Sequence, residues 1–87
     1  MNEISVNVEI TASDGIHARP ASELAKLAKS LGCEVVLRFN SKEAKASSII
    51  GILALGLKRG SILEVFVRGD NCEHTVNEIV NFIKGLR

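Results

Sequence analysis

The chain has 87 residues, a formal net charge of +1, and three Phe as its only aromatic residues. This length fits one domain, residues 1–87, with a single core that would bury roughly 60–65% of the unfolded chain's surface. A nearly neutral chain with so few aromatic side chains argues against a nucleic-acid binder, and no apolar stretch is long enough to insert into a membrane. Without an export signal, we expect a cytoplasmic protein in which Cys33 and Cys72 are free thiols.

The predicted elements begin with a strand that leads into a helix. Apolar and polar residues alternate from Ile4 to Ile10, which is the period of a half-buried strand. After Pro20 the apolar residues recur at intervals of three and four, which is typical of a helix. Pro20 lies in the first turn of this helix, where its missing N–H costs nothing. Gly32 is a common C-cap and is expected to end it.

The remaining elements are short and closely connected. Strands are expected over residues 34–39, 42–46 and 63–68, and a short helix over about residues 49–57. A last helix follows, capped by Asp70 or Asn71. The order β-α-β-β-α-β-α, with strands and helices that are apolar on one face, predicts an α+β protein of two layers. Its sheet would be open to solvent on one side and covered on the other.

The most informative segment joins the first strand to the first helix and reads Gly15-Ile16-His17-Ala18-Arg19-Pro20-Ala21. It puts His17 and Arg19 beside unpaired backbone N–H groups at the positive end of a helix dipole, a place suited to phosphate. A neutral imidazole nitrogen is a competent nucleophile near neutral pH. A phosphoryl group on His17 would be stabilised by the Arg19 guanidinium and by the backbone N–H groups from Ala18 onwards. A lone His-x-Arg is more often a surface pair, so the strand–turn–helix context carries this interpretation.

Two blocks of the sequence resemble the HPr family, the histidine-containing phosphocarriers of the sugar phosphotransferase system. Residues 15–21 resemble the active-site signature of that family. The second block is similar to the motif in which a serine opens a short helix, and it follows at the matching separation: Ser47-Ser48-Ile49-Ile50-Gly51-Ile52-Leu53-Ala54-Leu55-Gly56. The resemblance covers essentially the whole chain. It implies an HPr-like open-faced sandwich, with a four-stranded antiparallel sheet of order 1-4-2-3 covered on one face by three helices.

The resemblance also implies a function. The protein would be a carrier rather than an enzyme, accepting a phosphoryl group on His17 from phosphorylated Enzyme I and passing it to sugar-specific Enzyme II components such as Enzyme IIA. Family precedent puts the group on Nδ1, although the sequence itself does not choose between the ring nitrogens. No cofactor or metal is expected, and a monomer suits a shuttle that presents one face to successive partners.

Two groups of residues would form the partner surface. Lys26 and Lys29 lie three apart, on one side of the first helix. The resemblance implies that they help to dock Enzyme I, although a solvated helix face explains them equally well. Residues Ile49 and Ile50, together with Leu53, would form an exposed apolar patch beside the histidine.

Ser48 is the second candidate site, although any serine before an apolar helical run is first of all an N-cap, and Ser47 competes for that role. The resemblance implies that Ser48 is a regulatory phosphorylation site whose added charge would repel an acidic partner. The family commonly has a lysine before this serine, where the present chain has Ser47. Partnership with an HPr kinase/phosphorylase and a catabolite-control transcription factor therefore stays open.

Two alternative functions remain at this point. A regulatory, nitrogen-branch phosphocarrier would use the same histidine chemistry. Residues 34–38 faintly resemble that branch, whereas Gly51 favours the sugar branch. A signalling protein that acts on a transcription factor through phosphorylated Ser48 is more distant, because relatives that do only this lack the active-site histidine. A metal site is disfavoured since few ligands are available, and His74 is interpreted as a surface residue with no catalytic role.

Overall fold

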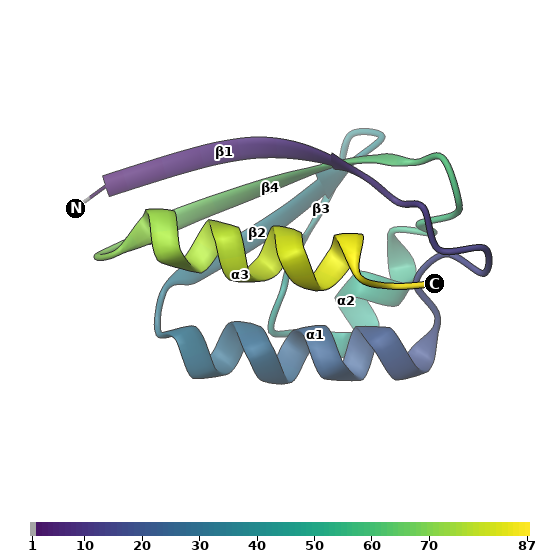
Figure 1. Ribbon diagram of the computed structural model, residues 1–87, viewed down its shortest axis with the longest axis horizontal. Helices are drawn as coiled ribbons and strands as arrows, with labels where there is room; N and C mark the ends of the chain where they lie inside the picture. Colours follow the sequence, from purple (N-terminus) through teal and green to yellow (C-terminus); the bar gives the residue numbers. More distant parts are fainter. Residues whose placement is uncertain (1) are drawn as a thin grey trace.

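The computed structural model describes residues 2–87, and over these it has the predicted order of strands and helices (Figure 1). All neighbouring strands are antiparallel, and their order across the sheet is β1-β4-β2-β3, which confirms the predicted topology. The elements are β1 (Asn2–Glu9), α1 (Ala18–Leu31), β2 (Glu34–Phe39), β3 (Lys42–Lys45), α2 (Ile49–Ala54), β4 (Ile62–Gly69) and α3 (Cys72–Lys84).

The helices lie together under one face of the sheet and leave the other face open (Figure 1). Strand β4 shows the cause, because Leu63, Val65 and Val67 are fully buried towards the helices while the residues between them are not. Helix α3 packs against β1 and β4, and α1 packs against α2 and α3. The result is one core, between the sheet and the helical layer, as the alternating pattern of the sequence predicts.

Helix α1 ends where the sequence predicts, at the residue before Gly32. Gly32 adopts the left-handed conformation with φ of 75° and caps the helix. The buried stripe of α1 consists of Pro20, Ala21, Leu24, Ala25 and Ala28. Small residues dominate this stripe, and the exposed lysines lie outside it.

Helix α2 is shorter than predicted and ends at Ala54 instead of near Leu57. The amide of Leu55 donates to Ile52 O (3.1 Å) and that of Gly56 donates to Leu53 O (3.2 Å), so the last turn is tightened by bonds to the third preceding residue. Gly56 then takes a φ of +68° and turns the chain out of the helix. The apolar spacing continues past this exit, which is why the sequence pattern overestimates the helix.

The end of β3 also differs from the prediction, whereas the start of α3 agrees with one of the two predicted caps. β3 ends at Lys45, one residue before Ala46, whose amide still donates to Val35 O (2.9 Å). Asn71, rather than Asp70, is the N-cap of α3, but its backbone is left-handed (φ 63°) and its side chain makes no capping bond. Asparagine is one of the few residues that tolerate this conformation.

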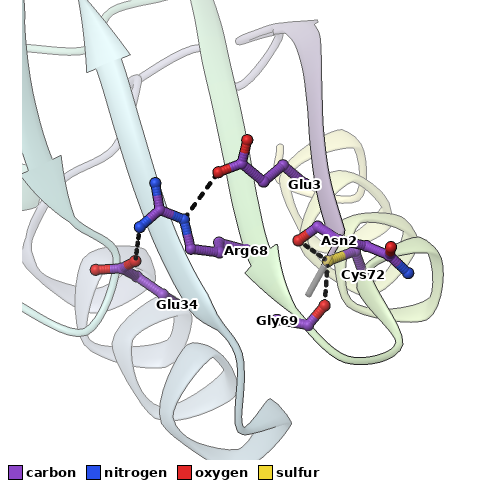
Figure 2. A network of polar contacts seen from close by, with 6 residues as sticks. All are labelled: Asn2, Glu3, Glu34, Arg68, Gly69 and Cys72. Atoms are coloured by element: carbon purple, nitrogen blue, oxygen red, sulfur yellow. Dashed lines mark hydrogen bonds and ion pairs between the residues drawn. The ribbon is translucent and has the colours of Figure 1, made fainter.

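The open face of the sheet carries two arginines, each placed between two carboxylates. Arg68 lies opposite Glu3 on one side and Glu34 on the other, with its guanidinium 2.9 and 3.9 Å from their oxygens (Figure 2). Both Arg68 and Arg38 lie over the ring of Phe66, at 5.8 and 4.9 Å from its centroid. Because these pairs are half-exposed, each contributes about 1 kcal/mol at most. The partners of Arg38 are Glu43 at 3.1 Å and Glu64 at 3.7 Å.

Both cysteines are free thiols, as expected. The buried Cys72 thiol, at the start of α3, donates to the carbonyl oxygens of Asn2 (3.1 Å) and Gly69 (2.9 Å) (Figure 2). The Cys33 thiol donates to Asp70 O at 2.9 Å. The two thiols thus hold the β4–α3 connection against β1 and the start of β2.

The packing makes a prediction about two isoleucines. Ile79 of α3 is fully buried, whereas Ile62 of β4 is 54% exposed. Ile79→Val should lower the free energy of unfolding by about 1 kcal/mol, because a methylene leaves a packed core. Ile62→Val, the same chemical change at the surface, should change it by less than about 0.5 kcal/mol. Urea titration followed by circular dichroism measures both values, and equal losses would contradict this assignment of the core.

Candidate functional site

His17 is the N-cap of α1 and stands at the surface. Its backbone is extended (φ −97°, ψ −168°), and its carbonyl oxygen accepts the first helical hydrogen bond, from the amide of Ala21 at 3.0 Å. The imidazole makes no capping hydrogen bond, and the residue is exposed. The ring is therefore available to react with a group brought to it from solvent.

Two backbone donors remain open at the start of α1. Within residues 2–87, the amides of Ala18 and Arg19 have no backbone acceptor. The next position is Pro20, which has no N–H, and the amide of Ala21 already bonds to His17 O. The ring of free donors expected from the sequence is thus interrupted at Pro20, and the amides of Ala18 and Arg19 stay open directly beside the histidine. Two amides and the positive end of the helix dipole still favour an anion at this place.

The turn before His17 depends on a close backbone approach at Gly15. This residue is buried and has a φ of +64°. A Cβ placed on it would lie 2.3 Å from Leu57 O and 2.9 Å from Lys58 Cα, so only glycine fits. The next amide, of Ile16, donates to the same Leu57 O at 3.1 Å. The β1–α1 junction is therefore fastened to the segment that follows α2.

That segment, residues 57–61, is itself a closed turn. The amide of Ser61 donates to Lys58 O (2.9 Å), and the Ser61 hydroxyl accepts from the amide of Lys58 (3.0 Å). Ile10 clamps the turn, because its amide donates to Ser61 O (2.8 Å) and its carbonyl accepts from Gly60 (2.7 Å). Sequence reasoning missed this support. It predicted only a helix that ends near residue 57.

The cations predicted from the sequence are all exposed but are not gathered at one point. Arg19 is exposed and makes no ion pair within residues 2–87. Lys26 and Lys29 are exposed on α1. At the helical rise of 1.5 Å per residue they lie roughly 14 and 18 Å along the helix from His17. Arg19 is thus placed to meet a group on the histidine, whereas the two lysines can meet only a larger partner.

Ser48 is the N-cap of α2. The sequence left Ser47 as a competitor for this role, and the structure assigns it to Ser48. Its hydroxyl accepts a hydrogen bond from the amide of Gly51 at 3.0 Å. A Cβ on Gly51 would lie 3.1 Å from both Ser48 Oγ and Ala44 Cβ, so the glycine makes room for this cap against β3.

Helix α2 also exposes an apolar surface. Ile50 is 81% exposed, and its neighbours Ile49 and Leu53 are about 40% exposed, whereas Ile52 is fully buried. Because α2 packs against α1, this apolar patch of Ile49, Ile50 and Leu53 lies on the same helical layer as His17. Large apolar side chains gathered at the surface are typical of an interaction site.

Other site types find no support in the described part of the chain. Residues 2–87 contain no group of three or more His, Cys, Asp or Glu that could hold a metal ion, and none of their helices is both long and apolar enough to cross a membrane. His74 is exposed in the first turn of α3. Figure 1 shows that this turn and the start of α1 lie at opposite ends of the helical layer.

Comparison with known proteins agrees with this geometry. Residues 4–85 match the family model described as the phosphorylation site of the HPr component of the phosphotransferase system. The chain is 34% identical over 79 residues to the phosphocarrier protein HPr of Vibrio cholerae, covering 91% of this chain and 93% of the relative. It is 35% identical over 82 residues to HPr of Haemophilus influenzae, covering 94% and 96%. The fold superposes on the crystal structure of HPr from Bacillus anthracis with a TM-score of 0.88, at 22% identity and covering 93% and 96%.

These findings define the class: an open-faced sandwich with an exposed histidine at a helix N-terminus. The chain belongs to the HPr family, and its general role is that of a phosphocarrier of the phosphotransferase system. The resemblance seen in the sequence is confirmed.

The close approach at Gly15 makes a prediction with a built-in control. Gly15→Ala should lower the free energy of unfolding by more than about 2 kcal/mol, because the positive φ costs about 1–2 kcal/mol and the added methyl meets backbone. Gly56 has a similar φ of +68° but nothing within 4 Å of its Cβ position. Gly56→Ala should cost only the backbone term, about 1 kcal/mol. Urea titration measures both, and equal losses would show that the junction does not depend on the contact with residues 57 and 58.

Proposed function

We propose that this protein accepts a phosphoryl group on a ring nitrogen of His17 from phosphorylated Enzyme I and passes it to Enzyme IIA components for sugar uptake. The observation that carries the proposal is the arrangement at the start of α1. An exposed imidazole without a capping bond stands beside the open amides of Ala18 and Arg19, and Arg19, two residues on, makes no ion pair within residues 2–87.

The chemistry needs no other group from this chain. The unprotonated nitrogen of the neutral His17 imidazole attacks the phosphorus held by the donor. A nitrogen–phosphorus bond forms as the bond to the donor breaks, and the donor keeps the electron pair of that bond. The other ring nitrogen keeps its proton, so no base is required. In onward transfer His17 is the donor: the acceptor nucleophile attacks the phosphorus, the nitrogen–phosphorus bond breaks, and the imidazole nitrogen keeps the electron pair of that bond.

The surroundings stabilise the charge without enclosing it. Charge-assisted hydrogen bonds from the guanidinium of Arg19 and from the two amides suit the oxygens of a phosphoryl dianion. His17 and Arg19 are both exposed. The site therefore favours the phosphorylated state while leaving the phosphorus open to attack by the next partner, which is what a carrier requires.

The docking surface in this proposal joins the α1 lysines to the apolar patch of α2. Lys26 and Lys29 lie too far along α1 to touch the phosphoryl group, and the apolar patch flanks the histidine on the helix packed beside it. Basic side chains around an apolar centre raise the association rate with an acidic partner such as Enzyme I without demanding high affinity. A monomer in the cytoplasm would present this face to donor and acceptor in turn.

The proposal predicts one reactive histidine. With Enzyme I and phosphoenolpyruvate, the wild-type protein should gain one phosphate, seen by intact mass, that is labile in acid and stable in alkali. His17→Gln should gain none, because the nucleophile is gone. His74→Gln, the matched control at the far end of the helical layer, should behave as wild type. A folded wild-type protein that gains no phosphate would refute the assigned donor, and labelling that survives in His17→Gln would refute the assigned residue.

We further propose Ser48 as a regulatory phosphorylation site, modified by an ATP-dependent kinase of the HPr kinase/phosphorylase kind. Its hydroxyl lies at the N-terminus of α2, where the dipole favours a phosphate, so modification need not unfold the helix. The neighbouring Ile49 and Ile50 are exposed. About two negative charges beside this patch would repel an acidic partner, and the modified surface could instead attract a transcription factor.

Two substitutions separate charge from capping at this position. Ser48→Asp and Ser48→Asn both supply a capping oxygen, so each should leave the free energy of unfolding within about 0.5 kcal/mol of wild type. Only Ser48→Asp adds charge, and it should slow phosphorylation of His17 by Enzyme I about threefold or more at low salt. Initial rates by intact mass provide the measurement. Equal rates for the two variants would mean that charge at Ser48 does not control docking.

A further inference from the structure

Four of the five arginines of this protein fall into two groups. Arg38 and Arg68, on the open face of the sheet, each lie between two carboxylates and are locally neutralised. Arg19 and Arg59 are exposed and make no ion pair within residues 2–87, and the same holds for Lys58. Arg19, Lys58 and Arg59 therefore belong to the two segments that meet at the β1–α1 junction, where Asp14 is an exposed acidic neighbour.

Lys58 and Arg59 are held in place by backbone, not by side-chain contacts. The Cβ position of Gly15 is 2.9 Å from Lys58 Cα, so Lys58 touches the turn that ends, two residues later, at His17. The turn of residues 58–61 is closed by two hydrogen bonds and clamped at Ile10. The backbone that carries Lys58 and Arg59 is thus fastened to the β1–α1 junction two residues before His17.

Their position complements that of the α1 lysines. Figure 1 shows the segment after α2 running beside the β1–α1 junction, on the side of the junction opposite to α1. Lys26 and Lys29 extend away from His17 along α1, in the other direction. Along the backbone, basic residues therefore stand on both segments that meet at the junction. One segment is the helix, and the other is the turn that the sequence pattern did not identify.

We infer that Lys58 and Arg59 form a second basic rim that attracts the acidic surface around the phosphoryl group of the donor protein. This inference rests on the proposed function. No hydrogen bond or ion pair within residues 2–87 orients either side chain, so the two suit non-directional attraction to a carboxylate-rich surface better than a shaped phosphate site. The expected effect is on the rate of encounter and not on the chemistry at His17.

The test compares charge removal at the rim with the same change elsewhere. Lys58→Gln, Arg59→Gln and the double variant are assayed as substrates of phosphorylated Enzyme I. The control is Lys45→Gln, an exposed lysine beside Ala28 at the other end of α1. The double variant should lower kcat/KM about fivefold at low ionic strength through KM, with kcat unchanged. The difference in kcat/KM between the double variant and the wild type should vanish near about 0.5 M salt, because the Debye length is then only a few ångströms. Lys45→Gln should match wild type.

A small-molecule donor separates encounter from chemistry. Phosphoramidate can phosphorylate an accessible imidazole without any protein partner, and in a His74→Gln background it reports His17 alone. The double variant should react with phosphoramidate at the wild-type rate. A rate reduced as much as with Enzyme I would assign the two cations to the phosphoryl group itself and overturn the inference.

Two other outcomes would also overturn the inference, and they differ in whether the assigned donor stands. If the double variant matches Lys45→Gln with Enzyme I, only the second rim is wrong, and the carrier function stands. If Enzyme I fails to phosphorylate the wild-type protein while phosphoramidate labels His17, the assigned donor is wrong, and the rim loses its partner with it.

Discussion

The absence of a side chain at Gly15 is the constraint on which the site depends. A side chain at Gly15 would keep the β1–α1 junction away from the carbonyl of Leu57, and the amide of Ile16 would then lose its acceptor. This contact decides where α1 begins and therefore where the imidazole of His17 stands. The helix then leaves two amides open at its first turn, since Pro20 supplies no third donor. One backbone approach thus fastens the turn that leads to His17 and to the open amides that follow it.

The arginines on the open face of the sheet are ion-paired, whereas the arginine beside the histidine is not within residues 2–87. On the open face, Arg38 and Arg68 are each placed between two carboxylates, and Phe66 lies beneath both guanidinium groups. Around the histidine, Arg19 has no ion pair within residues 2–87. The arginines of the sheet face are thus locally neutralised, whereas the guanidinium of Arg19 is open to an anion from solvent.

The sequence predicts this fold wherever the deciding interactions are local. Alternation identifies the strands, and Gly32 ends α1 because its own backbone takes the left-handed conformation. The end of α2 is a different case, since the apolar spacing continues past Gly56 while the chain leaves the helix. The site divides in the same way. His17 and Arg19 stand within one short segment, whereas the support from residues 57–61 is a contact between parts of the chain forty residues apart, which no periodicity records.

The pairing of β1 with β4 has a consequence for how the protein is made. Asn2 lies opposite Gly69, and the same two strands run together as far as Glu9 and Ile62. The first strand therefore has no partner in the sheet until most of the chain exists, and the loop that must close to unite them is long. Residues 57–61, which support the turn before His17, also precede β4 directly. During synthesis His17 emerges early, yet the turn before it finds its supporting contact only when residues 57–61 have followed.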